Sequence, residues 1–372
     1  MSAHHQLSDA IRSAVNTAHA DSLLSVAAPE TITLERPKNR DHGDYATSIA
    51  LVLAKAAGKP PREIAEIVVK ALSGNPTIEK LEIAGPGFIN ITLAKASQGA
   101  VVSSILNQKE KFGLGTSLKG IKINLEFISA NPTGPLHLGH TRWAAVGDAL
   151  GRTLTAAGAE VTREFYVNDR GVQMDLFGES IRASALGIAR PESGYQGAYI
   201  DDLAGQIKSE HPDFVTLPEK ESIVAFREAG YALQLKQQQD VLERFGTHFD
   251  VWFSERSMHE KDAIAKAMKQ LKAQGHVFEL EGATWLRTTD FGDDKDRVLI
   301  KSDGELTYFS SDTAYYVNKR DRGFDICIYM LGADHHGYVG RLKATAACAG
   351  DNPNYNIEVM IGQLVKIMEG GE

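Results

Sequence analysis

The stretch Ser129-Ala130-Asn131-Pro132-Thr133-Gly134-Pro135-Leu136-His137-Leu138-Gly139-His140 joins a predicted strand to a predicted helix. Before it, apolar and polar residues alternate over 121–127, which predicts a β-strand. After it, apolar residues recur at helical spacing over 139–157, and Gly158 suits the end of that helix. A second strand is predicted over 161–167. This order of strand, helix and strand indicates a βαβ unit and therefore a parallel sheet.

The loop has the composition of a phosphate-binding site. It follows the carboxyl end of a strand, where ligands bind in open α/β sheets, and the free N–H groups of the next helix attract phosphate. Gly134 and Gly139 let the backbone approach a ligand closely. His137 and His140 are three residues apart and can share one face of a turn. Two imidazoles there would bind phosphate oxygens and stabilise charge in a phosphorus-centred transition state.

The two histidines have two other interpretations, a surface turn and a zinc site. An isolated HxGH sequence favours a turn with two surface histidines, but the strand–loop–helix setting favours the phosphate site. Two histidines without an HExxH pattern are too few ligands for zinc, so we predict no metal site. The sequence contains neither a Walker A pattern nor a GxGxxG dinucleotide fingerprint.

The rest of the chain predicts two domains. Residues 1–118 form a small α/β domain, with helices over 6–19, 45–57, 62–72 and 94–110 and strands near 31–35, 78–84 and 88–93. Residues 119–372 form an α/β domain with a doubly wound, Rossmann-like parallel sheet, built from 121–174 and about 296–372. Its later elements are strands at 298–301, 305–309, 325–331 and 357–361 and a helix at 338–349. A mostly helical insertion is expected over 175–295.

Composition excludes several classes of protein. The 372 residues are 43% hydrophobic and 24% charged, which is ordinary for a globular chain. A net charge of −8 argues against nonspecific binding of nucleic acid by a generally positive surface. It still allows RNA to bind at a local basic patch. Cys327 and Cys348 lie in apolar surroundings and are expected to be buried free thiols. No apolar run reaches the ~20 residues of a membrane span, and no signal peptide is evident, so we expect a cytoplasmic protein.

Extended to Glu126, the stretch 126–140 resembles the HIGH signature of class I aminoacyl-tRNA synthetases, and of arginyl-tRNA synthetases in particular. Three further parts of the sequence resemble the same family. They are residues 163–173, the block 332–338, and the N-terminal segments 42–50 and 85–90. The resemblance therefore covers nearly the whole chain.

The resemblance implies activation of L-arginine with ATP and Mg²⁺, followed by transfer to tRNA(Arg), by a monomer. The implied catalytic residues are His137 and His140. The implied ATP-binding residues are Pro132, Thr133, Gly134, His137, Gly139, His140 and Asp334. The implied arginine-binding residues are Glu126, Ser129, Asn131, His140, Tyr308, Asp312, His336 and Gln363.

Physical chemistry supports acidic residues in this set, because carboxylates pair bidentately with a planar guanidinium. Tyr308 and Asp312 are four apart and share a face if a helix begins there. On its own, Asp312 would be a charge favoured by a helix N-terminus, with Ser310 or Ser311 as the cap. The polar loop at Asp334 would equally cap the next helix.

Other polar groups remain open. Asn168, Asp169 and Gln173 follow the second strand and either line the pocket rim or form a turn. In the N-terminal domain, Arg36, Lys38 and Arg40 form a basic cluster that is either solvated or contacts tRNA phosphates. Tyr45 and Phe88 are candidates for base stacking, although Phe88 is expected in the core.

The resembling family has a second phosphate-binding loop of the KMSK type and an anticodon-binding domain, and neither is found in the 372 residues. We therefore expect a C-terminally truncated chain with weak or no aminoacylation. Two alternatives stay open: a small nucleotidyltransferase of the same superfamily, and a noncatalytic tRNA-binding fragment of a synthetase.

Overall fold

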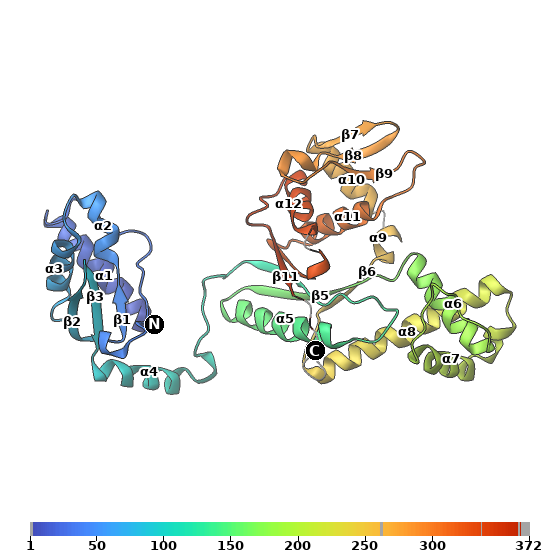
Figure 1. The fold of residues 1–372 in the computed structure, drawn as a ribbon, viewed down its shortest axis with the longest axis horizontal. Coiled ribbons are helices and arrows are strands. Elements are labelled where there is room, and N and C mark those ends of the chain that lie inside the picture. The colour runs from blue at the N-terminus through green and yellow to red at the C-terminus, as the bar shows by residue number, and fades with distance from the viewer. Residues whose placement is uncertain (1–2, 261–262, 336, 364, 366–372) are drawn as a thin grey trace. The chain divides into compact units, whose positions relative to one another are not determined.

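The computed structural model describes residues 3–260, 263–335, 337–363 and 365 (Figure 1). The chain divides into two compact units, Met1–Gly113 and Leu114–Glu372. The change of unit falls inside the sequence Lys111–Ser117, whose glycine, threonine and serine residues are typical of a linker.

The first unit packs helices on a three-stranded antiparallel sheet of order β1-β3-β2. In α1, the buried residues Leu7, Ile11 and Val15 recur every four positions, and this apolar stripe joins the core under the sheet. The elements are α1 (Ala3–Ala20), η1 (Arg40–His42), β1 (Tyr45–Thr47), α2 (Ile49–Ala57), α3 (Pro61–Leu72), β2 (Ile78–Ala84), β3 (Phe88–Leu93), α4 (Lys95–Gln108) and η2 (Lys109–Lys111).

Two details of this unit differ from the sequence prediction. The helix predicted over 45–57 begins only at Ile49, because Tyr45–Thr47 pairs with β3 as a strand. The Thr47 hydroxyl donates to Thr33 O (2.8 Å) and accepts from Ile49 N (3.3 Å), which fixes the turn between strand and helix. The strand predicted over 31–35 is reduced to one bridge between Glu35 and Ala46.

The second unit contains the predicted parallel sheet. Its five strands have the order β11-β10-β4-β5-β6, and every neighbouring pair is parallel. They are β4 (Lys122–Glu126), β5 (Glu160–Val167), β6 (Val251–Ser254), β10 (Ile326–Gly332) and β11 (Ile357–Gly362). The chain runs outward from β4 to β6 and then returns to the other side of β4 with β10. The doubly wound fold is thereby confirmed, and its switch point lies between the carboxyl ends of β4 and β10.

The helices of this unit are α5 (Leu138–Ala156), α6 (Val172–Leu186), α7 (Tyr199–Glu210), α8 (Glu219–Phe245), α9 (Arg256–Glu260), α10 (Ala263–Ala273), α11 (Tyr308–Asp321) and α12 (Tyr338–Cys348), with shorter turns η3 (Pro212–Thr216), η4 (Thr288–Phe291) and η5 (Ala333–His335). In Figure 1, α5 and the group of α11 and α12 lie on opposite sides of the sheet, whereas α6 and α7 form a lobe apart from it at the end of α8. A separate antiparallel sheet consists of β7 (Val277–Leu280), β8 (Ala283–Leu286) and β9 (Arg297–Ile300).

The structure differs from the sequence prediction in two parts of this unit. Strand β6 belongs to the central sheet but lies inside 175–295, where only an insertion was expected. It has only four residues, too few to show a period. The stretch 305–309 is not a strand, because α11 begins at Tyr308, and β9 pairs with β8 outside the central sheet.

Close packing fixes α5 on the sheet. A Cβ built on Gly147 of α5 would lie 2.3 Å from Cδ2 of Phe127, which follows β4 and is fully buried. Cys327 and Cys348 are buried and unbridged, as the sequence predicted. Across the described residues, we find no helix of the length and apolarity that a membrane crossing requires.

We predict that Gly147→Ala lowers the free energy of unfolding by about 1–3 kcal/mol, because the methyl group has no room against the Phe127 ring. Gly205→Ala in α7 is the matched control, since nothing lies within 4 Å of its added Cβ. It should instead stabilise by about 0.5–1 kcal/mol. Urea unfolding measures both, and equal effects would contradict the packing described.

Candidate active site

The chain turns sharply where β4 ends. Ile128 and Ser129 have φ angles of 68° and 45°, a left-handed conformation that is strained for a β-branched residue. Hydrogen bonds maintain it: the Ser129 hydroxyl donates to Glu126 Oε1 (3.2 Å) and accepts from Tyr166 N (3.1 Å). The surrounding structure thus holds a strained turn at the sheet's switch point, a pattern typical of functional sites.

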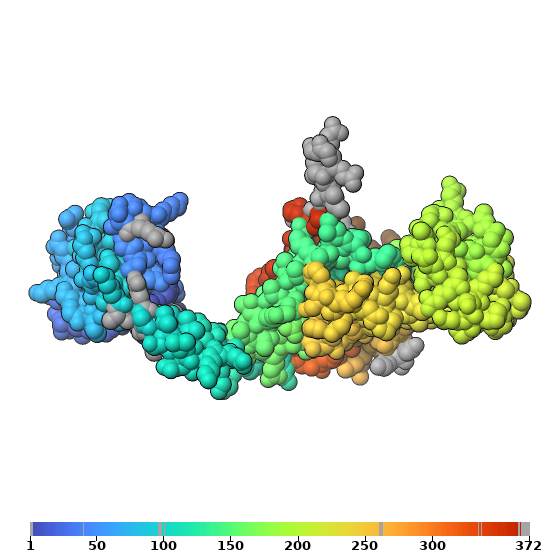
Figure 2. All heavy atoms as spheres, turned by 90° about the horizontal axis from the view of Figure 1, so that it is seen from below, coloured from blue at the N-terminus to red at the C-terminus, as the bar shows by residue number. Residues whose placement is uncertain are grey.

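Helices α6–α8 hold the following loop. Buried Gln238 of α8 donates from Nε2 to the carbonyls of Asn131 (3.0 Å) and Gly134 (2.9 Å). The Tyr199 hydroxyl of α7 donates to Thr133 O (2.9 Å), and Asn131 Nδ2 donates to Gln173 Oε1 (2.9 Å). Figure 2 shows α6 and α7 gathered in one lobe from which the yellow α8 extends. The sequence prediction missed Gln238 and Tyr199, because no local pattern marks either residue.

Three residues of the loop set the start of α5. His137 is the N-cap: its Nδ1 accepts from Gly139 N (3.1 Å), and its backbone N donates to His140 Nδ1 (3.1 Å). The two rings stack with centroids 3.8 Å apart. A Cβ on Gly139 would lie 2.9 Å from His137 Cε1, so a larger residue there would displace the His137 ring. Because both Nδ1 atoms accept, each neutral ring carries its proton on Nε2 and can donate it to a ligand.

Burial, together with the charge of His137, lowers the pKa of His140 to about 4. His140 is therefore neutral near pH 7. It acts as a hydrogen-bond donor and not as a cation.

A second group of site residues is acidic. Burial and the negative charge of Glu255 raise the pKa of Asp312 to about 7; Glu126 adds to the increase and Arg341 opposes it. Burial also raises the pKa of Glu255, against a hydrogen bond from Tyr166. Among the described residues, none donates a hydrogen bond to the Asp312 carboxylate. These desolvated carboxylates favour a cationic ligand.

A cavity of about 940 Å³ lies beside this acidic group. Tyr308, Ser311 and Glu255 line it, and Tyr308 is 77% exposed. Sequence reasoning identified Tyr308 and missed Glu255, which follows the short strand β6. A different hollow of about 310 Å³ is lined by His137, His140 and residues of α8.

The remaining predicted site residues are placed as follows. Pro132 and Thr133 are buried in the loop, Asn131 is exposed, and Gln363 is exposed after β11. Asp334 lies in η5 directly after β10, and His336 lies outside the described residues. The N-cap of α12 is Gly337, without a side-chain cap, and the N-cap of α11 is Thr307, whose hydroxyl accepts from Ser310 N. The N-cap of α11 is therefore neither Ser310 nor Ser311, and the N-cap position of α12 is not Asp334.

Glu126 has partners that the sequence did not reveal. Its Oε2 accepts from Lys319 Nζ (2.5 Å), and its Oε1 accepts from Ser129. Lys319 is fully buried on α11. The Glu126 carboxylate, which was predicted to bind arginine, is thus already paired with the Lys319 ammonium group.

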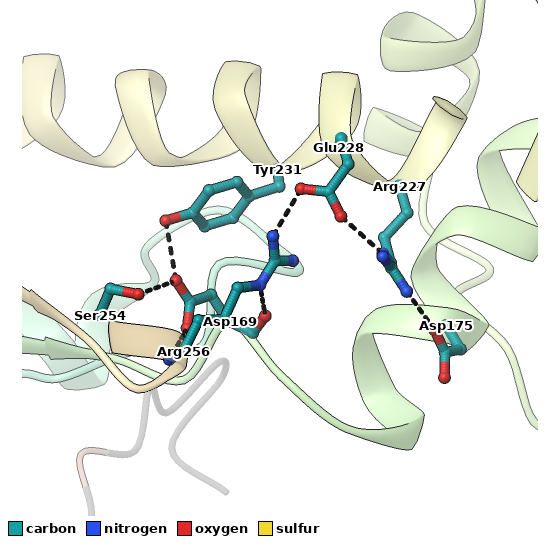
Figure 3. A network of polar contacts seen from close by, with 7 residues as sticks. All are labelled: Asp169, Asp175, Arg227, Glu228, Tyr231, Ser254 and Arg256. Atoms are coloured by element: carbon teal, nitrogen blue, oxygen red, sulfur yellow. Dashed lines mark hydrogen bonds and ion pairs between the residues drawn. The ribbon is translucent and has the colours of Figure 1, made fainter. Parts of the chain in front are cut away.

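Asp169 anchors the loop after β5 (Figure 3). Its buried carboxylate accepts from Tyr231 (3.2 Å), Ser254 (2.6 Å) and the backbone N of Arg256 (3.1 Å). The Arg256 guanidinium forms an ion pair with the Glu228 carboxylate of α8 (2.6 Å). Glu228 also forms an ion pair with Arg227. Asp169 lines the 940 Å³ cavity too, so it fixes the cavity wall.

Two aromatic side chains of the first unit, Phe88 and Tyr45, differ in exposure. Phe88 is 40% exposed whereas Tyr45 is buried, with Arg36 over its ring at 5.4 Å. The expectation of a buried Phe88 was wrong, because Phe88 is the first residue of β3, next to the turn that joins β2 to β3. Over the part of the chain that the structure describes, no group of three His, Cys, Asp or Glu side chains suits a metal ion.

Comparison with known proteins gives the class first. Residues 101–361, which carry both hollows, match the family described as "tRNA synthetases class I (R), catalytic domain". The second unit is therefore a class I synthetase catalytic domain. Residues 5–93 match "Arginyl tRNA synthetase N terminal domain". With both units matched, the chain belongs to the arginyl-tRNA synthetase family.

Individual relatives and a solved structure agree with this family assignment. The chain is 53% identical to an arginine–tRNA ligase of Frankia alni over 98% of its own length and 66% of the relative's. It is 55% identical to that of Renibacterium salmoninarum over 92% and 62%. The Thermus thermophilus arginyl-tRNA synthetase shares the fold, with a TM-score of 0.65 at 21% identity over 96% and 66%. The chain thus spans slightly less than two thirds of these relatives.

We predict that His140 titrates with a pKa near 4, since protonation would place a cation in a partly buried position beside His137. Its folded pKa lies below the ordinary value of 6.5, so its contribution to stability is lost as pH falls from about 6.5 toward 4. Histidine-selective NMR titration, assigned with His140→Gln, measures this. A midpoint near 6.5 for His140 would contradict the partial burial of its ring beside His137.

Proposed function

We propose that this chain binds L-arginine and ATP and forms arginyl-adenylate as part of an arginine–tRNA ligase. The observation that carries the proposal is the pair of desolvated carboxylates, Asp312 and Glu255, of which Glu255 lines the 940 Å³ cavity. A guanidinium presents a planar set of donors that two carboxylates can share, and its positive charge offsets theirs. Tyr308 lies at the exposed side of this cavity, where it would cover the bound side chain.

In this proposal, ATP lies at the start of α5. The backbone N–H groups of that helix and the Nε2–H groups of His137 and His140 would contact phosphate oxygens. The clamped loop 131–134 would present its backbone to the nucleotide, with Asp334 near it after β10. Segment 131–140 contains no carboxylate, so we propose that Mg²⁺ arrives bound to the phosphates and offsets their charge.

The reaction needs little proton transfer from the protein. An oxygen of the arginine carboxylate attacks the α-phosphorus of ATP, the bond to the bridging oxygen breaks, and pyrophosphate leaves with the electron pair. Negative charge that develops on the α-phosphate oxygens would be stabilised by the Nε2–H donors of His137 and His140. Positioning of the two substrates supplies the rest of the rate enhancement.

The third substrate is proposed to be tRNA(Arg), whose terminal adenosine hydroxyl would attack the arginyl carbonyl of the adenylate and release AMP. In the first unit, exposed Phe88 could stack on a base while Arg36 and Lys38 contact phosphates. The proposal includes a monomer that acts in the cytoplasm.

Calorimetric titration of the 372-residue chain with L-arginine tests the proposal, with L-citrulline as an uncharged ligand of similar shape. Arginine should bind at least tenfold more tightly, and its affinity should rise with pH through about 7, because Asp312 must release its proton. Asp312→Asn should weaken arginine binding by roughly 30-fold or more, since it removes one partner of a desolvated ion pair.

Asp202→Asn is the matched control, because Asp202 is exposed in the first turn of α7, away from the cavity. It should leave arginine binding unchanged. Equal affinity for arginine and citrulline would overturn the proposed function.

A further inference from the structure

Helix α8 makes polar contacts at the carboxyl ends of β4, β5 and β6, which are neighbours in the sheet. Its Gln238 donates to two carbonyls of the loop after β4, at 3.0 and 2.9 Å. Its Tyr231 donates to Asp169 after β5 (3.2 Å). Its Glu228 forms an ion pair with Arg256 after β6 (2.6 Å). Because Asp169 and Arg256 line the 940 Å³ cavity, one helix connects the cavity wall with the loop after β4.

The three contacts come from one face of α8. Residues 228, 231 and 238 are three and seven positions apart, spacings that return to the same side of a helix. Figure 3 shows Glu228 and Tyr231 pointing from α8 toward Arg256 and Asp169. Positions 228 and 238 are about 15 Å apart along the axis, since each residue of an α-helix rises about 1.5 Å. The backbone between them is one continuous helix, so a displacement at Glu228 reaches position 238.

The cavity wall is held by contacts of its own. The backbone N of Arg256 donates to Asp169 Oδ1 (3.1 Å), and Arg256 Nε donates to the Asp169 carbonyl (2.5 Å). The Ser254 hydroxyl donates to Asp169 Oδ2 (2.6 Å). Arg256 therefore stays in place without Glu228, and α8 is the part that loses an anchor when the ion pair is broken.

At the other end, the loop after β4 follows the position of one buried amide. Gln238 is 1% exposed, and its Nε2 donates to the carbonyls of Asn131 and Gly134, on both sides of Pro132 and Thr133. Pro132 has a fixed φ angle, so the segment between these two carbonyls has little freedom to adapt. A shift of Gln238 would therefore move loop 131–134 or break its hydrogen bonds.

We propose that Glu228 is a positioning residue for loop 131–134: its ion pair with Arg256 fixes α8, and Gln238 transmits the position of α8 to the loop. This inference rests on the proposed function, because it takes that loop as the one that binds ATP. Glu228 acts through other residues, since it contacts Arg256 without lining the cavity itself.

Two other roles for Glu228 lead to different results. A glutamate that only stabilised the fold would lower the melting temperature and leave the affinities for both substrates alone. A glutamate that held the cavity wall would change the affinity for arginine. A positioning residue for the loop changes the affinity for ATP, although its ion pair lies on the side of the arginine cavity.

The experiment measures the affinities of the full chain for ATP with Mg²⁺ and for L-arginine by calorimetry, together with the melting temperature. In Glu228→Met, ATP should bind roughly tenfold more weakly, which corresponds to the loss of one hydrogen bond between charged groups. The affinity for arginine should change little, because Asp169 still holds Arg256. Loss of arginine affinity with unchanged ATP affinity would contradict the inference.

Glu219→Met is the matched control. It also removes a glutamate of α8 that pairs with an arginine, but its partner is Arg182 of α6 (3.2 Å), inside the lobe of α6 and α7. Arg182 keeps its hydrogen bond to Ser222 (3.2 Å). This variant should leave the affinity for ATP unchanged. A loss of ATP affinity equal to that of Glu228→Met would make the role of Glu228 a general effect of destabilising the lobe.

A double-mutant cycle tests whether Glu228 acts through Gln238. Gln238→Leu removes the donor to the loop and should weaken ATP binding by itself. In that background, Glu228→Met should weaken ATP binding less than it does alone, because the connection to the loop is already broken. Fully additive losses would overturn the inference. Tyr231→Phe, which removes the neighbouring anchor without a change of charge, serves in the same cycle if Glu228→Met does not fold.

The two proposals fail in different ways. If the unmodified chain does not bind ATP, the proposed function and the role of Glu228 are both wrong. If the unmodified chain binds ATP and Glu228→Met binds it equally well, only the role of Glu228 is wrong.

Discussion

Two ion pairs, the buried pair of Lys319 with Glu126 and the partly exposed pair of Arg322 with Glu164, attach the α11 segment to the centre of the parallel sheet. Charges in such an environment are stable only with close partners, so the pairing admits little displacement of the helix along β4 and β5. The position of Asp312, at the other end of α11, follows from that attachment. One electrostatic constraint in the core thereby determines where the acidic pocket lies relative to the loop that follows β4.

The phosphate-binding loop depends on a different set of contacts. Its backbone is held from α7 and α8 by Tyr199 and Gln238, and its strained residues Ile128 and Ser129 are fixed by hydrogen bonds to β5 and Glu126. The helices between β5 and β6 are therefore more than an appendage, because they shape the backbone that the nucleotide would contact. The Asp169–Arg256–Glu228 network ties the same helices to the cavity wall (Figure 3).

The sequence predicted the features that local patterns encode. The strands before and after α5, the helix predicted over 139–157 and the spacing of Tyr308 and Asp312 all depend on residues close together in the chain. It did not predict Lys319 opposite Glu126, which is 193 positions away in a charged run typical of a solvated surface. Glu255 was missed for a related reason: its strand has four residues, and only pairing with β5 shows that it ends at the site.

The central claim is that the acidic group formed by Asp312 and Glu255 binds the guanidinium of L-arginine. A crystal structure of the chain with L-arginine tests it most directly. The account predicts guanidinium nitrogens within about 3 Å of both the Asp312 and the Glu255 carboxylates. Arginine bound elsewhere, in contact with neither carboxylate, would contradict it.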